Sequence, residues 1–285
     1  MQSYPKKQTT IKLSQSKQSQ IVKLLLITLL CISDSVNADE QAIDSVVNSD
    51  VNTPASLMAH SDIYINTTTT TQNGQATARH NTYHCSDTPV SVIATSIQDL
   101  ALICDGAQQA AYFLAQYQLV ITQTIVIRII ERPLSFQGYS AYGSYNKHTN
   151  AIEIMSLAYI QQHTDTPTMY GQPFDQIHYK AAVAHEMVHS ISHQNSPLDT
   201  LSQSAQEYLA HATQLAVLPT HYRSVIINAA NIEPWLPGDT ISDIYMAISP
   251  TKFAVKSYLH LTTTADPSAF VNIILNAKWM YVDAS

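Results

Sequence analysis

The chain has 285 residues, 14 of them basic and 21 acidic, and a formal net charge of −7. Five of the basic residues and one of the acidic residues lie in residues 1–38, so residues 39–285 carry a net charge of −11. This excess of acid argues against nucleic acids and anionic membrane surfaces as partners. The 247 residues that follow position 38 suffice for one large domain or two coupled subdomains.

Residues 1–38 have the pattern of a signal peptide. Lysines come first, an apolar run extends from Leu24 to Ile32, and small residues precede a cleavage position after Ala38. The apolar run is too short for a transmembrane anchor, although an uncleaved N-terminal anchor is the alternative interpretation. We therefore expect an exported protein, periplasmic or secreted, with no membrane anchor in its mature form.

Residues 39–82 are polar and weakly patterned, and we expect a linker that is partly disordered. A pro-segment is the alternative. After position 38 the chain keeps two cysteines, Cys85 and Cys104. In an oxidising compartment a disulfide between them is the economical interpretation.

Residues 83–195 alternate between strand and helix patterns. The runs 90–94 and 120–131 are dense in β-branched residues and predict strands, with a helix at 96–118 between them. Residues 140–155 predict a hairpin with its turn near 146–150. A short helix at 157–163 and a loop at 164–173 follow. A longer helix should then begin after the cap Asp175 and run to His193.

From residue 196 onward the patterns are helical. Thr200 and Gln203 predict a capping box for a helix that runs through Leu218. Further helical segments are predicted near 221–231, 241–249, 251–263 and 267–277. The fold class is therefore α+β, with an α/β subdomain at 83–195 and a helical subdomain at 196–285.

The helix at 175–193 contains the motif H-E-x-x-H, at His185, Glu186 and His189. Residues four apart share one face of a helix, so the two imidazoles can reach one metal ion. Glu186 lies about 100° further round the helix, where its carboxylate can reach a water on that metal. With 12 histidines and six glutamates in the chain, chance placement gives about 0.01 such motifs. A metal site is favoured over a pair of buried structural histidines.

The motif resembles the active-site helix of the zincin metallopeptidases. As in that superfamily, the residues around the two histidines are uncharged and Ile191 is hydrophobic, whereas Ala182 replaces the usual Val or Thr. The metzincin branch would need a glycine and a third histidine where Ser192 and Asn195 stand. The gluzincin branch takes a glutamate from a second helix about twenty residues downstream, and Glu207 lies 18 residues after His189.

The resemblance covers roughly residues 140–218. It implies a zincin-like fold, with a small mixed sheet and an edge hairpin over the active-site helix. It also implies one zinc ion (Zn²⁺) per chain, held by His185, His189 and Glu207. Glu186 would be the general base that takes a proton from zinc-activated water.

Several further residues are candidates around this site. His211 stands where several gluzincins carry a residue that orients a zinc histidine, and it is also an alternative ligand. His193 and His178 lie near the ligand face and are expected beside the metal rather than on it. An edge strand over the helix binds extended substrate in zincins, and the candidates here are Gly143, Ser144 and Tyr145. The donor to the oxyanion stays open among Tyr222, Tyr245, Tyr258, His221 and His260.

Two functions follow from these residues. The favoured one is an exported zinc metallopeptidase that acts on a peptide or protein substrate. The alternative is a binding or scaffold protein with a closed structural zinc site. In that case His185, His189, Glu207 and His211 would be four ligands and would leave no position for water.

Overall fold

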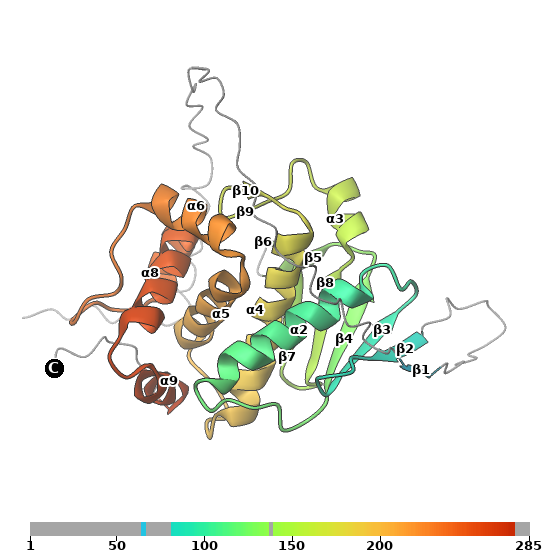
Figure 1. Cartoon of the computed structure of the whole chain (residues 1–285), viewed down its shortest axis with the longest axis horizontal. Helices are drawn as coiled ribbons and strands as arrows, with labels where there is room; N and C mark the ends of the chain where they lie inside the picture. Colours follow the sequence, from blue (N-terminus) through green and yellow to red (C-terminus); the bar gives the residue numbers. More distant parts are fainter. Residues whose placement is uncertain (1–63, 67–80, 137–138, 277–285) are drawn as a thin grey trace, which may run out of the picture. The chain divides into compact units, whose positions relative to one another are not determined.

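The computed structural model describes residues 64–66, 81–136 and 139–276 (Figure 1). All of them fall in one compact unit, Ala59–Ser285. The strands of the described residues are β1 Tyr64–Asn66, β2 Asn81–His84, β3 Val90–Ala94, β4 Ile125–Ile130, β5 Leu134–Phe136, β6 Tyr139–Ala141, β7 Gly143–Asn146, β8 Ala151–Met155, β9 Thr168–Met169 and β10 Gln172–Pro173. The helices are α2 Leu100–Ala115, α3 Leu157–His163, α4 Gln176–Asn195, α5 Gln203–Val217, α6 Thr220–Ala230, α7 Asp243–Ile248, α8 Pro250–Thr263 and α9 Pro267–Asn276.

The main sheet is mixed, with the strand order β1-β2-β3-β4-β8-β7. Strands β3, β4 and β8 run parallel to one another, and β7 pairs antiparallel with β8 at one edge. The parallel strands are rich in β-branched residues, and Ile127, Ile152 and Ile154 have no exposed surface. Such residues suit a strand that is covered on a face by helices. The predicted strand at 90–94 and the predicted hairpin are confirmed, and the strand expected at 120–131 is shorter.

Helices α2 and α4 pack against each other and against the sheet, and α4 also contacts β7 and β8 (Figure 1). The two helices approach closely at Gly106, where an added Cβ would lie 2.5 Å from the carbonyl oxygen of Lys180. A glycine inside α2 is therefore a packing requirement. Helix α5 packs on α4, and α8 packs on α5. The fold is mixed α+β, as predicted.

Two predicted helix starts were wrong, and one strand was not predicted. Helix α2 starts at Leu100 because the hydroxyl of Ser96 accepts a hydrogen bond from the Gln98 amide in a preceding turn. Helix α5 is capped by Ser202, whose hydroxyl accepts from the Ala205 amide, and not by a box at Thr200. Within the expected linker, Tyr64–Asn66 is a strand that pairs with β2.

The expected disulfide is present between Cys85 and Cys104, and it joins the end of β2 to α2. In the ranges that the structure describes, no helix is both long enough and apolar enough to cross a membrane. The predicted signal peptide at 1–38 and the rest of the expected linker, apart from residues 81–82, lie outside the described residues.

Candidate metal centre

Helix α4 carries the H-E-x-x-H motif. The carboxylate of Asp175 caps the helix by accepting hydrogen bonds from the amides of Ile177 and His178, each at 2.9 Å. The run that follows contains neither glycine nor proline, and its residues from Ala181 to Ala184 are buried. Helix α4 is therefore buried on all sides here, and the side chains of His185 and His189 face Glu207 of α5.

Helix α5 brings Glu207 to both imidazoles. The Nε2 atom of His185 lies 3.4 Å from Oε2 of Glu207, and Nε2 of His189 lies 3.7 Å from Oε1. One donor atom from each of the three residues lies within 4.8 Å of the others. Zinc bonds of about 2.0–2.1 Å in tetrahedral geometry place neighbouring donor atoms roughly 3.4 Å apart. Two imidazoles and one carboxylate at these separations therefore fit a zinc ion.

The electrostatics prepare the donors for a cation. Burial raises the pKa of Glu207, but the hydrogen bond from His185 and the charges of His189 and His185 outweigh it and hold the pKa well below the usual range. Burial lowers the pKa of His189 to about 4. For His185 burial is outweighed by the hydrogen bond and charge of Glu207, so its pKa is raised. At neutral pH the carboxylate is ionised and His189 is neutral, as metal binding requires, whereas the raised pKa of His185 favours a proton that a metal ion would have to displace.

The side chain of Glu186, on α4, is buried against the edge strand β7. Only 9% of its surface is exposed. A Cβ added at Gly143 would lie 2.7 Å from Cγ of Glu186 and 3.0 Å from Oε1. A side chain at position 143 would therefore displace the carboxylate. Burial raises the pKa of Glu186 to about 7, with the charge of His185 lowering it and that of Glu207 raising it.

The other residues of β7 line the same region. The rings of Tyr145 and His193 lie 5.6 Å apart, so His193 sits beside the edge strand, one turn of α4 beyond His189. The Tyr145 hydroxyl donates to Asn150 in the β7–β8 turn. The side chain of Ser144 is partly buried.

His211 also reaches the cluster. Its Nε2 atom lies 3.7 Å from Oε2 of Glu207, and its ring lies 4.8 Å from that of His185. Burial, together with the charge of His185, lowers the pKa of His211 to about 3, although the charge of Glu207 opposes the change. His178 does not join the cluster, because its Nδ1 lies 2.8 Å from the Asp175 carboxylate at the start of α4.

The five residues considered as oxyanion donors make contacts elsewhere in the described structure. The Tyr222 hydroxyl donates to Asp175 at 2.7 Å, and the ring of His221 packs on Tyr222. The other three pair with neighbours in the helical region: Tyr245 with Trp235, Tyr258 with Arg223, and His260 with Tyr208. None of these contacts links the five residues to the histidine cluster.

Two residues of the site, Tyr170 and Gln214, were not predicted from the sequence. The Tyr170 hydroxyl, from the turn between β9 and β10, lies 2.7 Å from Nδ1 of His211 and donates to the side-chain oxygen of Gln214. The same oxygen of Gln214 lies 3.0 Å from Nδ1 of His185. Gln214 is seven residues after Glu207 on α5, so helical periodicity could have placed it on the ligand face. Nothing in the sequence pointed to Tyr170.

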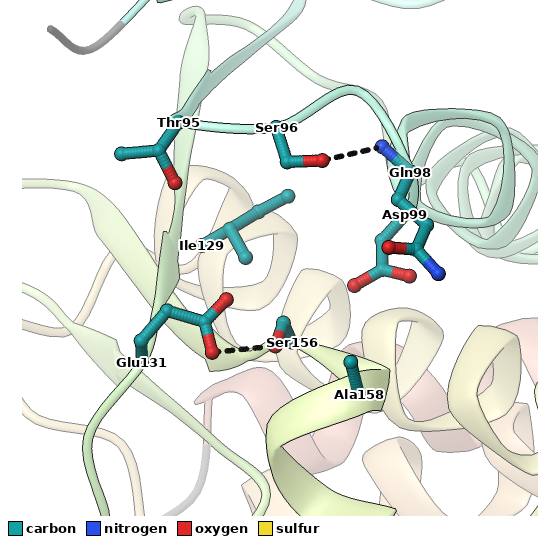
Figure 2. Close-up of a pocket in the computed structure, with 8 residues that line it drawn as sticks. All are labelled: Thr95, Ser96, Gln98, Asp99, Ile129, Glu131, Ser156 and Ala158. Atoms are coloured by element: carbon teal, nitrogen blue, oxygen red, sulfur yellow. Dashed lines mark hydrogen bonds between the residues drawn. The ribbon is translucent and has the colours of Figure 1, made fainter.

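A separate polar recess lies at the carboxyl ends of β3, β4 and β8 (Figure 2). The carboxylates of Asp99 and Glu131 turn toward it; Asp99 accepts a hydrogen bond from the Leu157 amide and Glu131 from the Ser156 hydroxyl. Burial, and to a smaller extent the charge of Glu131, raises the pKa of Asp99. At about 30 Å³ the recess can hold water but no organic substrate. Because both carboxylates anchor the start of α3, we assign the recess a structural role.

Residues 58–283 match the model of a protein family that is described as a family of unknown function (DUF6639). No curated protein and no solved structure matches the chain. The description of the family assigns no activity, so the function has to be argued from the residues of the site.

Proposed function

The chain belongs to DUF6639, a family of unknown function, and we propose that it is an exported zinc metallopeptidase with a gluzincin-like centre. One observation carries this proposal: His185, His189 and Glu207 converge from two packed helices, with the carboxylate of Glu186 buried beside them. A closed structural site has no use for a carboxylate in that position. An open catalytic site does, because it needs a base next to the metal.

The chain's own groups divide the work in this proposal. His185, His189 and Glu207 would hold one zinc ion per chain, which would supply a Lewis acid to polarise a carbonyl and acidify water. The carboxylate of Glu186 takes the proton of the attacking water and delivers it to the leaving amine nitrogen. Gly143 leaves room for that carboxylate because it has no side chain.

Strand β7 supports a peptide as the substrate. It is the last strand of the main sheet, so its outer edge has no hydrogen-bonded partner strand among the described elements. An extended peptide can add to such an edge through backbone hydrogen bonds. Since Gly143 touches Glu186, a peptide paired with β7 would pass next to the general base. Gly143, Ser144 and Tyr145 are the residues that we propose to form this contact.

The arrangement also supports the resemblance to zincins. A mixed sheet ends in an antiparallel edge strand, the H-E-x-x-H helix packs against that strand, and the third ligand comes from the next helix. We propose that this is a zincin-like fold. Export is part of the same proposal, and it is supported by the sequence of residues 1–38 and by the Cys85–Cys104 disulfide.

A closed zinc site in a binding protein is the second candidate, because His211 lies 3.7 Å from Glu207 and could be a fourth ligand. Peptide digestion separates the two candidates. The mature protein, loaded with zinc, should cleave a peptide library; a chelator should abolish cleavage and a hydroxamate should inhibit it. Retention of zinc without cleavage and without hydroxamate binding would favour the closed site instead.

A further inference from the structure

A chain of hydrogen bonds connects the β9–β10 turn to two imidazoles of the centre. The Gln214 side-chain nitrogen lies 3.1 Å from the sulfur of Met169. The Gln214 oxygen faces both the Tyr170 hydroxyl and Nδ1 of His185. The Tyr170 hydroxyl in turn faces Nδ1 of His211. Gln214 is 4% exposed, so solvent does not compete for its amide.

Met169 determines the donor and acceptor roles in this chain of hydrogen bonds. A thioether sulfur accepts hydrogen bonds and cannot donate them, so Met169 orients the Gln214 amide with its nitrogen toward the sulfur. The amide oxygen then faces Tyr170 and His185 and can only accept. Tyr170 must donate its single proton to Gln214, and Nδ1 of His185 must also carry a proton.

The same logic continues to His211. Because the Tyr170 proton is given to Gln214, the Tyr170 oxygen is an acceptor toward Nδ1 of His211. Nδ1 of His211 therefore carries the proton. In both rings Nε2 is the atom that faces Oε2 of Glu207; without metal it can hold a second proton and donate it to that carboxylate, and with metal it can offer its lone pair. If the Gln214 amide were reversed, its nitrogen would face Tyr170 and His185, and each hydrogen bond would run in the opposite direction. Both Nε2 atoms would then carry the protons.

The backbone of the turn is consistent with a positioning role. Tyr170 has φ of 53°, in the left-handed region, and Gly171 follows with φ of 76°. Glycine adopts such angles freely, whereas a bulky aromatic residue does so only when its surroundings hold it there. The surroundings of Tyr170 include the hydrogen bonds to His211 and Gln214.

We propose that Tyr170 and Gln214 are positioning residues that fix the tautomers of His185 and His211, so that both rings present an Nε2 lone pair to the metal centre. This inference rests on the proposed metal site but not on the reaction assigned to it. It has a consequence for His211: a ring with its proton on Nδ1 cannot donate from Nε2 to an oxyanion. His211 is instead a nitrogen donor ready for the metal.

The tautomers can be measured without any metal. Long-range ¹H–¹⁵N spectra of the imidazoles in chelator-treated protein separate Nδ1–H from Nε2–H, and His185→Gln and His211→Gln assign the two rings. The wild type should show Nδ1–H for both. Tyr170→Phe should free the tautomer of His211 alone. Gln214→Leu should free the tautomers of both rings, because Tyr170 then has no acceptor for its proton. An Nδ1 without a proton on either ring of the wild-type protein would overturn the proposal.

A matched control is Tyr142, which lies between β6 and β7 and contacts the β9–β10 hairpin. The Tyr142 hydroxyl donates to the backbone oxygen of Thr168 in β9, so Tyr142→Phe removes a hairpin hydrogen bond without touching the network. It should leave both tautomers unchanged. An equal effect of Tyr142→Phe and Tyr170→Phe would mean that the hairpin matters only as a structural support, and the proposal would fail.

Zinc affinity gives a second readout that does not use activity. Loss of a residue that orients a metal ligand typically weakens metal binding about 10–100-fold. Gln214→Leu should fall in that range in a chelator competition, and Tyr142→Phe should bind zinc like the wild type. If the protein shows Nδ1–H tautomers and binds zinc tightly but cleaves no peptide, this inference stands and the proposed function is wrong. If the protein cleaves peptides but its rings carry the proton on Nε2 and not on Nδ1, the proposed function stands and this inference is wrong.

Discussion

Gly143 in β7 is the position where one methyl group should disturb the site most. An added Cβ would lie 2.7 Å from Cγ of Glu186 and 3.0 Å from Oε1. Non-bonded carbon atoms prefer separations of about 3.5–4.0 Å, so Gly143→Ala requires a shift of roughly 1 Å in Glu186 or in the strand. Overpacking of this kind costs about 1–3 kcal/mol of unfolding free energy.

The displaced carboxylate should also slow the reaction. A misplacement of about 1 Å at a catalytic group can cost about 10²-fold in rate. We therefore expect Gly143→Ala to lose roughly 10–100-fold in kcat/KM on a cleaved peptide, and to lower the denaturant midpoint in urea unfolding. Ser144→Ala, one residue along the same strand, keeps the backbone through which a peptide would pair with β7, so it should stay close to the wild type in both assays.

A double-mutant cycle shows whether the loss arises from Glu186. In a Glu186→Ala background the atoms that Gly143→Ala would meet are absent, so the alanine at position 143 should cost much less stability there. An equal cost in both backgrounds would refute the close approach of β7 to Glu186, and with it the argument that places substrate beside the base.

Three other residue sets give direct tests. Glu207→Ala should lose zinc by metal analysis far more readily than His211→Ala, because Glu207 contacts both helix α4 ligands; the opposite order would assign the third ligand to His211. Asp175→Ala should cost about 1 kcal/mol in chelator-treated protein at pH 7, since it removes the cap of α4. Burial raises the pKa of Asp175, but hydrogen bonds from His178 and Tyr222 lower it more. The stabilisation is therefore present above the unfolded pKa of about 3.8 and is lost as pH falls through the lower folded pKa, so urea curves of variant and wild type should converge in strong acid. Reduction of Cys85–Cys104, 19 residues apart, should cost about 3 kcal/mol in the chain-entropy estimate, and an unchanged midpoint with reductant would contradict it.

Local patterns predicted the parts of the site that lie on single helices. The spacing of His185 and His189 follows from helical geometry, and the cap at Asp175 is a local signal. Helix α5 was predicted as an element, so Glu207 could be matched to a third ligand by its distance along the chain. Strands β3 and β4 were predicted because they are rich in β-branched residues, and β8 was predicted as one arm of a hairpin.

Contacts between distant segments were not predictable in the same way. Gly143 and Glu186 are 43 residues apart, and Tyr170 reaches Gln214 across 44 residues. Neither contact has a periodic signal, because each depends on how β7 and the β9–β10 turn pack on the helices. The strand Tyr64–Asn66 was hidden for the same reason: it pairs with β2 across a polar segment. Tertiary packing, rather than local propensity, decides such positions.

The most direct test of the central claim is the rate and zinc content of Glu186→Gln. The amide keeps the shape of the buried side chain but cannot accept a proton from water. The variant should keep one zinc ion per chain and lose about 10²–10⁴-fold in kcat on a peptide that the wild type cleaves. Hydrolysis at the wild-type rate with zinc still bound would contradict the assignment of Glu186 as the base and the peptidase mechanism that depends on it.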